Sequence, residues 1–169
     1  MRRRTAYMGM YLAVALILSY VESLIPISVG IPGVKLGLAN LIVVIMLYLA
    51  DWREALLISV LRIVLSGAMF GNLFGILYGL AGGLFSFFVM ALLIKSDRFH
   101  VVTVSICGGV AHNMAQLVVA AFLVESYYVI YYMPVLLIAG MLTGTLVGII
   151  SREAGRRLPA GLWSKRSES

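Results

Sequence analysis

The sequence predicts an all-α integral membrane protein, a bundle of six transmembrane helices with both termini in the cytoplasm. Three observations lead to this fold class. The 169-residue chain is 62% hydrophobic and only 12% charged, and its mean hydropathy is +1.04, whereas soluble domains carry about 25% charged residues. Apolar runs of membrane-helix length are separated by short polar turns. Lys and Arg residues concentrate in alternate turns.

The six predicted spans cover approximately residues 6–25, 36–50, 55–69, 73–94, 101–124 and 129–150. The second and third are short. At about 1.5 Å per residue they cross a bilayer only where it is thinned, or where loop residues extend them. No polar stretch is long enough for a soluble domain. We therefore predict one membrane domain over residues 1–169, in which residues 151–169 form a cytoplasmic tail.

The positions of the 13 Lys and Arg residues predict the orientation. If the N-terminus is cytoplasmic, Lys35 is the one Lys or Arg residue in an outer loop, and Arg62 is the one within a span. The cytoplasmic set is Arg2, Arg3, Arg4, Arg53, Lys95, Arg98, Arg152, Arg156, Arg157, Lys165 and Arg166. This is a strong positive-inside pattern, typical of a multi-pass protein of the cell membrane. The net charge of +6 is thereby a topology signal, and it does not indicate nucleic-acid binding.

Small residues recur at intervals of four in three of the predicted helices. Two glycine series, Gly71, Gly75, Gly79 and Gly83 in the fourth span and Gly140, Gly144 and Gly148 in the sixth, predict close helix packing, mainly within one subunit. The first span has two weaker pairs, Gly9 with Ala13 and Ala15 with Ser19. We interpret these two pairs as candidate contacts with the helix of a partner.

Polar side chains within the spans predict a binding site. The candidate substrate-binding residues are Lys35, Asn40, Arg62, Asn72, His112, Asn113 and Gln116. In the chosen orientation nearly all of them fall between the bilayer midplane and the outer surface, as an outward-opening pocket requires. Structural roles remain open: Arg62 could pair with Glu22, and His112 could hydrogen-bond between helices. One Cys and two His residues, none at ligand spacing, predict no metal site or cofactor.

Two segments, PGVKLGLAN (residues 32–40) and GGVAHNMAQL (residues 108–117), carry a family resemblance. With the six predicted spans, the chain resembles the Gx transporter family, also called heptaprenyl diphosphate synthase component I. That family is similar to the substrate-binding S components of energy-coupling factor (ECF) transporters. The resemblance implies a ligand-binding subunit that associates with a transmembrane coupling protein and cytoplasmic ATPases. S components carry Ala-x-x-x-Ala in the first helix, and this chain has only the Gly9/Ala13 and Ala15/Ser19 pairs instead.

The chemistry of the residues excludes two enzyme classes. Prenyl-transfer enzymes hold Mg²⁺ with clusters of aspartates, and this chain has only Asp51 and Asp97, in separate turns. It has no phosphate-binding loop for ATP hydrolysis. We therefore expect a non-enzymatic, S-component-like subunit for uptake of a small molecule. The alternative is a non-catalytic membrane partner in isoprenoid or quinone (heptaprenyl diphosphate) biosynthesis.

Overall fold

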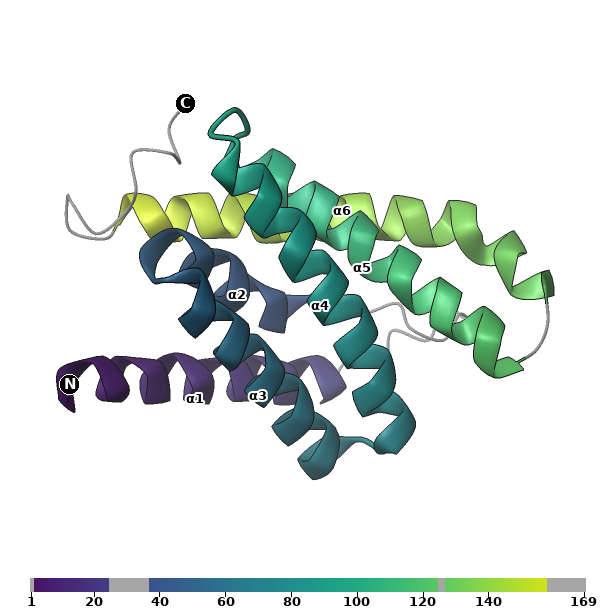
Figure 1. The fold of residues 1–169 in the computed structure, drawn as a ribbon, viewed down its shortest axis with the longest axis horizontal. Coiled ribbons are helices and arrows are strands. Elements are labelled where there is room, and N and C mark those ends of the chain that lie inside the picture. The colour runs from purple at the N-terminus through teal and green to yellow at the C-terminus, as the bar shows by residue number, and fades with distance from the viewer. Residues whose placement is uncertain (1, 25–36, 125–126, 158–169) are drawn as a thin grey trace.

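The computed structural model describes residues 2–24, 37–124 and 127–157, and this part of the chain is almost entirely helical (Figure 1). Its elements are α1 (Arg2–Leu24), α2 (Leu38–Leu49), α3 (Trp52–Phe70), α4 (Leu73–Lys95), α5 (Val101–Val124), the 3₁₀ helix η1 (Tyr127–Tyr132) and α6 (Met133–Arg156). The described residues contain no strand. The predicted all-α class is confirmed.

Four of these helical segments are long and apolar enough to cross a membrane, so the chain is a multi-pass membrane protein. The segments are Thr5–Leu24, Leu73–Lys95, Val101–Leu123 and Tyr128–Arg156. Helix α2 has 12 residues, and the 19 residues of α3 include Arg53, Glu54 and Arg62. These two helices occupy the two short predicted spans. Helix α6 continues to Arg156, into the segment predicted as tail, and η1 precedes it.

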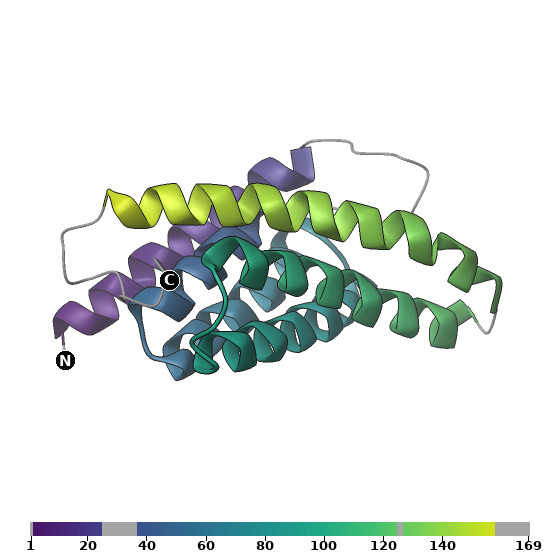
Figure 2. The ribbon, with the colours of Figure 1, turned by 90° about the horizontal axis from the view of Figure 1, so that it is seen from above.

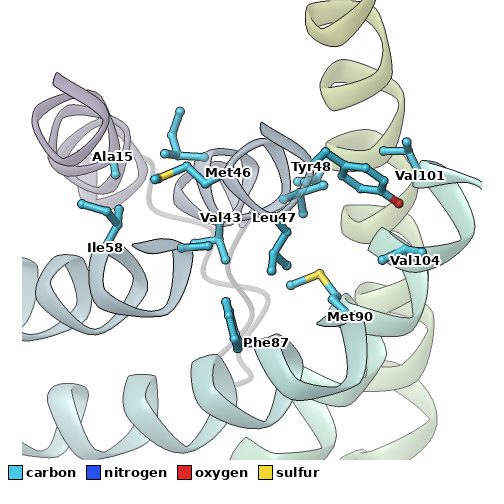
Figure 3. Packing of buried hydrophobic residues seen from close by; sticks show 14 residues of the cluster. Ala15, Val43, Met46, Leu47, Tyr48, Ile58, Phe87, Met90, Val101 and Val104 are labelled. Atoms are coloured by element: carbon cyan, nitrogen blue, oxygen red, sulfur yellow. The ribbon is translucent and has the colours of Figure 1, made fainter. Parts of the chain in front are cut away.

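Helix α2 lies at the centre of the bundle, which explains how so short a helix is accommodated. Seven consecutive residues, 42–48, are buried, so the helix is enclosed on all sides. It contacts α1, α3, α4 and α6. Figure 3 shows its side chains Val43, Met46 and Leu47 among Ala15, Ile58, Phe87 and Met90 of the neighbouring helices. Its backbone is thus largely covered by protein.

Helices α5 and α6 make the most extensive contact in the bundle, and the glycines of α6 allow it. A Cβ atom at Gly144 would lie 2.7 Å from Ile106 Cα and from the Ser105 carbonyl oxygen, and one at Gly148 would lie 2.7 Å from Val102 Cα. The two backbones therefore touch. The sequence-based prediction of a packing face at Gly140, Gly144 and Gly148 is confirmed.

The glycine series of α4 serves more than one neighbour. Cβ atoms at Gly79 and Gly83 would lie 2.9 Å and 2.5 Å from the Ile63 side chain of α3, so these two positions form the predicted packing face. Gly71 instead follows the last residue of α3. Gly75 lies in the first turn of α4, where its N–H donates to the Asn72 side chain at 2.7 Å. Only half of the predicted series packs against a helix.

The two ends of the bundle differ in charge. The start of α1, the α2–α3 turn, the α4–α5 turn and the end of α6 all lie toward the left in Figures 1 and 2. These regions contain Arg53, Lys95, Arg98, Arg152, Arg156 and Arg157. Within the described ranges the opposite end, formed by the end of α1, the α3–α4 turn and η1, carries no Lys or Arg. The fold thus gathers the cations that the orientation prediction places in the cytoplasm.

Candidate functional site

The inner face of α1 carries two polar residues at its uncharged end. Ala15 is fully buried, and Ser19 and Glu22 follow it at spacings of four and seven, so the three share one helix face. Glu22 accepts a hydrogen bond from the Gly37 N–H at 2.6 Å. Gly37 has a φ of +71° and immediately precedes α2. The Glu22 carboxylate therefore ties the end of α1 to the start of α2.

Helix α3 presents Ser59 and Arg62 to the same region. Ala55 is fully buried, and Ile58 and Ser59 are each 1% exposed. Arg62 follows Ala55 at a spacing of seven and so lies on this buried face. Arg62 interacts electrostatically with Glu22, while its Nε atom is buried without a hydrogen-bond partner. Proximity to Glu22 agrees with the pairing role left open by the sequence, although the carboxylate hydrogen-bonds to Gly37.

Helix α5 places His112 and Gln116 against α4. A Cβ atom at Gly82 would lie 2.9 Å from His112 Nε2 and 3.0 Å from Gln116 Cγ. Gln116 is 4% exposed, and its Oε1 atom is buried without a hydrogen-bond partner. Both side chains therefore fill the space that glycine leaves on α4. Gly79 and Gly83, which flank Gly82 on α4, lie against Ile63 of α3. The neighbouring Arg62 of α3 is therefore at a similar level of the bundle to His112 and Gln116 of α5.

Asn113 has a different environment from its neighbour His112. Its Nδ2 atom donates to the Leu136 carbonyl oxygen of α6 at 2.8 Å, and the residue is buried. The adjacent residue on a helix points about 100° away, so Asn113 faces α6 while His112 faces α4. In this structure Asn113 holds α5 to α6.

Two further candidate residues, Asn40 and Asn72, lie toward the uncharged end. Asn40 is half-buried in the first turn of α2. Asn72 is exposed, and its Oδ1 atom accepts the Gly75 N–H at the start of α4. Lys35 lies outside the described residues. The structure therefore brings Arg62 near Glu22 and brings His112 to Gln116, whereas Asn72 caps a helix.

The candidate partner contacts on α1 divide between two faces. Gly9 and Ala13 are exposed, and a Cβ atom at Gly9 would meet nothing within 4 Å. Ala15 is fully buried and belongs to the hydrophobic core, and the Ser19 Oγ atom is buried. Only the Gly9/Ala13 pair lies on a surface that another protein could reach.

The sequence-based site omitted three buried groups. Ser59 and Ser86 are 1% and 0% exposed, and their hydroxyl oxygens have no hydrogen-bond partner. Gly82 was not in the predicted glycine series, yet it is the position against which His112 and Gln116 pack. A sequence signal was available for one of the two serines, because Ser59 lies three residues before Arg62. In the described ranges no three His, Cys, Asp or Glu residues cluster as metal ligands.

Comparison with known proteins gives one family match. Residues 11–154 match the family described as heptaprenyl diphosphate synthase component I. The chain belongs to this family. The matched segment begins within α1 and ends within α6, so it includes every described candidate substrate-binding residue. No curated protein and no solved structure matches the chain.

Proposed function

We propose that this member of the heptaprenyl diphosphate synthase component I family is a non-catalytic membrane subunit that works with a separate prenyl diphosphate-forming enzyme. The family match over residues 11–154 carries this proposal. The word "component" in the family description implies a second protein. That protein would be the synthase component that performs the chemistry.

The distribution of acidic residues supports a non-catalytic role. Mg²⁺-dependent prenyl transfer needs several carboxylate oxygens at one place. The two aspartates lie in different turns, Asp51 just before α3 and Asp97 just after α4, and Glu22 is near the opposite end of the bundle. We infer that the subunit binds or positions a ligand in the membrane while its partner catalyses the bond-forming step.

Copurification from the native membrane tests this proposal. We expect a tagged chain to isolate a soluble prenyl diphosphate synthase subunit, and native mass spectrometry to identify the complex. A lysate lacking the tagged chain is the control for non-specific capture. If deletion of the gene left the length and amount of cellular polyprenyl products unchanged, and no synthase subunit were isolated, the proposal would be wrong.

A second candidate function is solute uptake as an S-component-like subunit, and the inward-facing polar residues favour it. Glu22, Arg62, His112 and Gln116 come from three helices and lie on inner helix faces. Polar groups in a membrane bundle are costly, and they commonly mark a substrate path. In this role the partners are a transmembrane coupling protein and cytoplasmic ATPases, and the exposed Gly9/Ala13 face of α1 is the proposed contact.

A double variant tests whether the exposed Gly9/Ala13 face of α1 contacts a partner protein or only lipid. We expect Gly9→Leu with Ala13→Leu to abolish copurification of a membrane partner, because bulky side chains prevent close helix approach. Thermal stability of the isolated chain should be unchanged, since both positions are exposed. Val14→Ala, a truncation at a neighbouring exposed position, is the matched control. Partner capture that is unaffected by the Leu substitutions would remove this face from the proposal.

A further inference from the structure

Four polar side chains lie on the inward sides of two neighbouring helices, and we name them the α1–α3 polar seam: Ser19 and Glu22 of α1, and Ser59 and Arg62 of α3. Both helices run from the charged end toward the uncharged end (Figure 1), and they pack against each other. Figure 3 places Ala15 beside Ile58. Four residues further along each helix are Ser19 and Arg62, so these two residues lie at a similar level, while Ser59 lies about one turn before Arg62 and Glu22 about one turn after Ser19.

The seam has hydrogen-bonding capacity that the protein itself does not use. Ser19 Oγ, Ser59 Oγ and Arg62 Nε are all buried without a hydrogen-bond partner. Ser59 is only 1% exposed. More than about 90% of buried polar groups in proteins are paired, and an unpaired group is more costly still within a bilayer. Three such atoms within about one helical turn therefore indicate a site for a polar ligand.

The chemistry of these atoms selects the ligand class. Arg62 Nε–H is a charged donor, and each serine hydroxyl can also donate. Donors of these kinds match an oxyanion, and the planar guanidinium fork fits phosphate or carboxylate oxygens. An ammonium group would face the positive charge of Arg62.

Glu22 sets the conditions under which such an anion binds. Its carboxylate accepts the Gly37 N–H at 2.6 Å and interacts electrostatically with Arg62. Without ligand, Glu22 therefore supplies the counter-charge for the buried guanidinium. An incoming oxyanion is attracted by Arg62 and repelled by Glu22, so the two anions compete for one cation.

We propose that the α1–α3 polar seam binds the oxyanion headgroup, phosphate or carboxylate, of this protein's ligand, with Arg62 as the cation, Ser19 and Ser59 as hydroxyl donors and Glu22 as the competing counter-ion. The inference rests on the ligand-binding role proposed above and adds the chemical class of the ligand. It applies to a prenyl diphosphate and equally to a water-soluble anion.

Binding to the purified, detergent-solubilised chain tests the proposal. The probes are phosphate, pyrophosphate, acetate, farnesyl diphosphate and farnesol, each measured by calorimetric titration and by thermal shift. We expect Arg62→Gln to weaken binding of the preferred oxyanion by at least tenfold. Glu22→Gln should tighten it on the order of tenfold, because it removes a nearby negative charge while its amide oxygen can still accept from Gly37. Arg53→Gln, at an exposed position in the charged end, is the control.

The pattern across probes identifies the source of the headgroup. Arg62-dependent binding of farnesyl diphosphate but not of farnesol or the small anions supports a lipid ligand, and Arg62-dependent binding of a small anion supports a soluble one. The proposal is overturned if no oxyanion binds the wild type or Glu22→Gln, or if Arg62→Gln binds as tightly as the wild type. It is also overturned if Glu22→Gln binds the preferred oxyanion more weakly than the wild type does, since Glu22 would then not compete with the ligand for Arg62. Copurification of partners, measured on the same variants, reports separately on the proposed subunit role.

Discussion

Asn113 was predicted from the sequence to bind a ligand, but in the structure its side chain makes a hydrogen bond between two helices. Its amide reaches the Leu136 carbonyl oxygen at 2.8 Å across the α5–α6 contact. The sequence placed His112, Asn113 and Gln116 together as candidate ligands. Spacing alone could group His112 with Gln116, but it could not reveal that an α6 carbonyl lies opposite Asn113.

We expect Asn113→Leu to destabilise the protein by about 1 kcal/mol, because it removes a buried hydrogen bond between α5 and α6. Thermal unfolding in detergent measures the change. Leu123→Ala, at a half-exposed position of the same helix (51%), should have a smaller effect. If Asn113→Leu unfolded no earlier than this control, the hydrogen bond would be irrelevant to stability.

Gly82 is a second residue whose role follows from its neighbours. A methyl group there would meet the His112 ring at 2.9 Å and the Gln116 Cγ atom at 3.0 Å. Because those side chains can rotate aside, we expect Gly82→Ala to lower stability only modestly. If His112 and Gln116 contact the ligand, the same change should weaken ligand binding. Calorimetry with the ligand identified by mass spectrometry checks this, and unaltered binding would place the ligand elsewhere.

At the scale of elements, the α5–α6 pair depends on contact between backbones, whereas α1 presents an open face. Gly144 and Gly9 were both recognised in the sequence as members of small-residue patterns. Their surroundings differ completely: backbone atoms of α5 lie against Gly144, and no atom lies within 4 Å of a Cβ at Gly9. Sequence spacing predicted where helices could pack closely, but the identity of the neighbouring helix depends on the three-dimensional arrangement.

The two glycines form a matched pair for experiment. Gly144→Ala should strongly destabilise the protein, by several kcal/mol or to the point of failed expression, because the backbones must separate to admit the methyl group. Gly9→Ala should leave the thermal midpoint unchanged or raise it slightly, since alanine favours helix. Equal effects of the two substitutions would contradict the close α5–α6 packing.

At the scale of the whole molecule, the fold collects the cationic turns at one end. Composition, apolar runs and charge were sufficient to predict a membrane protein, the number of its helices and their approximate bounds. Much of the candidate site could not be predicted in this way. Arg62 and His112 stand out because charged or polar residues are rare in membrane helices. Ser19 and Ser59 are common residue types, and only the burial of their hydroxyl groups without a hydrogen-bond partner distinguishes them.

The predicted orientation can be tested by cysteine labelling in intact cells, on a Cys107→Ala background. We expect Asp97→Cys, in the α4–α5 turn, to react with a membrane-impermeant maleimide only after the cells are permeabilised. Tyr131→Cys, in η1 at the opposite end and 80% exposed, should react in intact cells. The opposite labelling pattern would invert the topology, and the polar residues of the site would then lie nearer the cytoplasm.

The enclosure of α2 has a consequence for biogenesis. A 12-residue segment is too short to partition into the bilayer by itself, since an independent span needs about 20 residues. Its stability depends on α3, α4 and α6, which are translated after it. We therefore expect α2 to reach its buried position only after the later helices have emerged from the ribosome. Packing of the bundle around α2 would then be a late step that follows membrane insertion of the other helices.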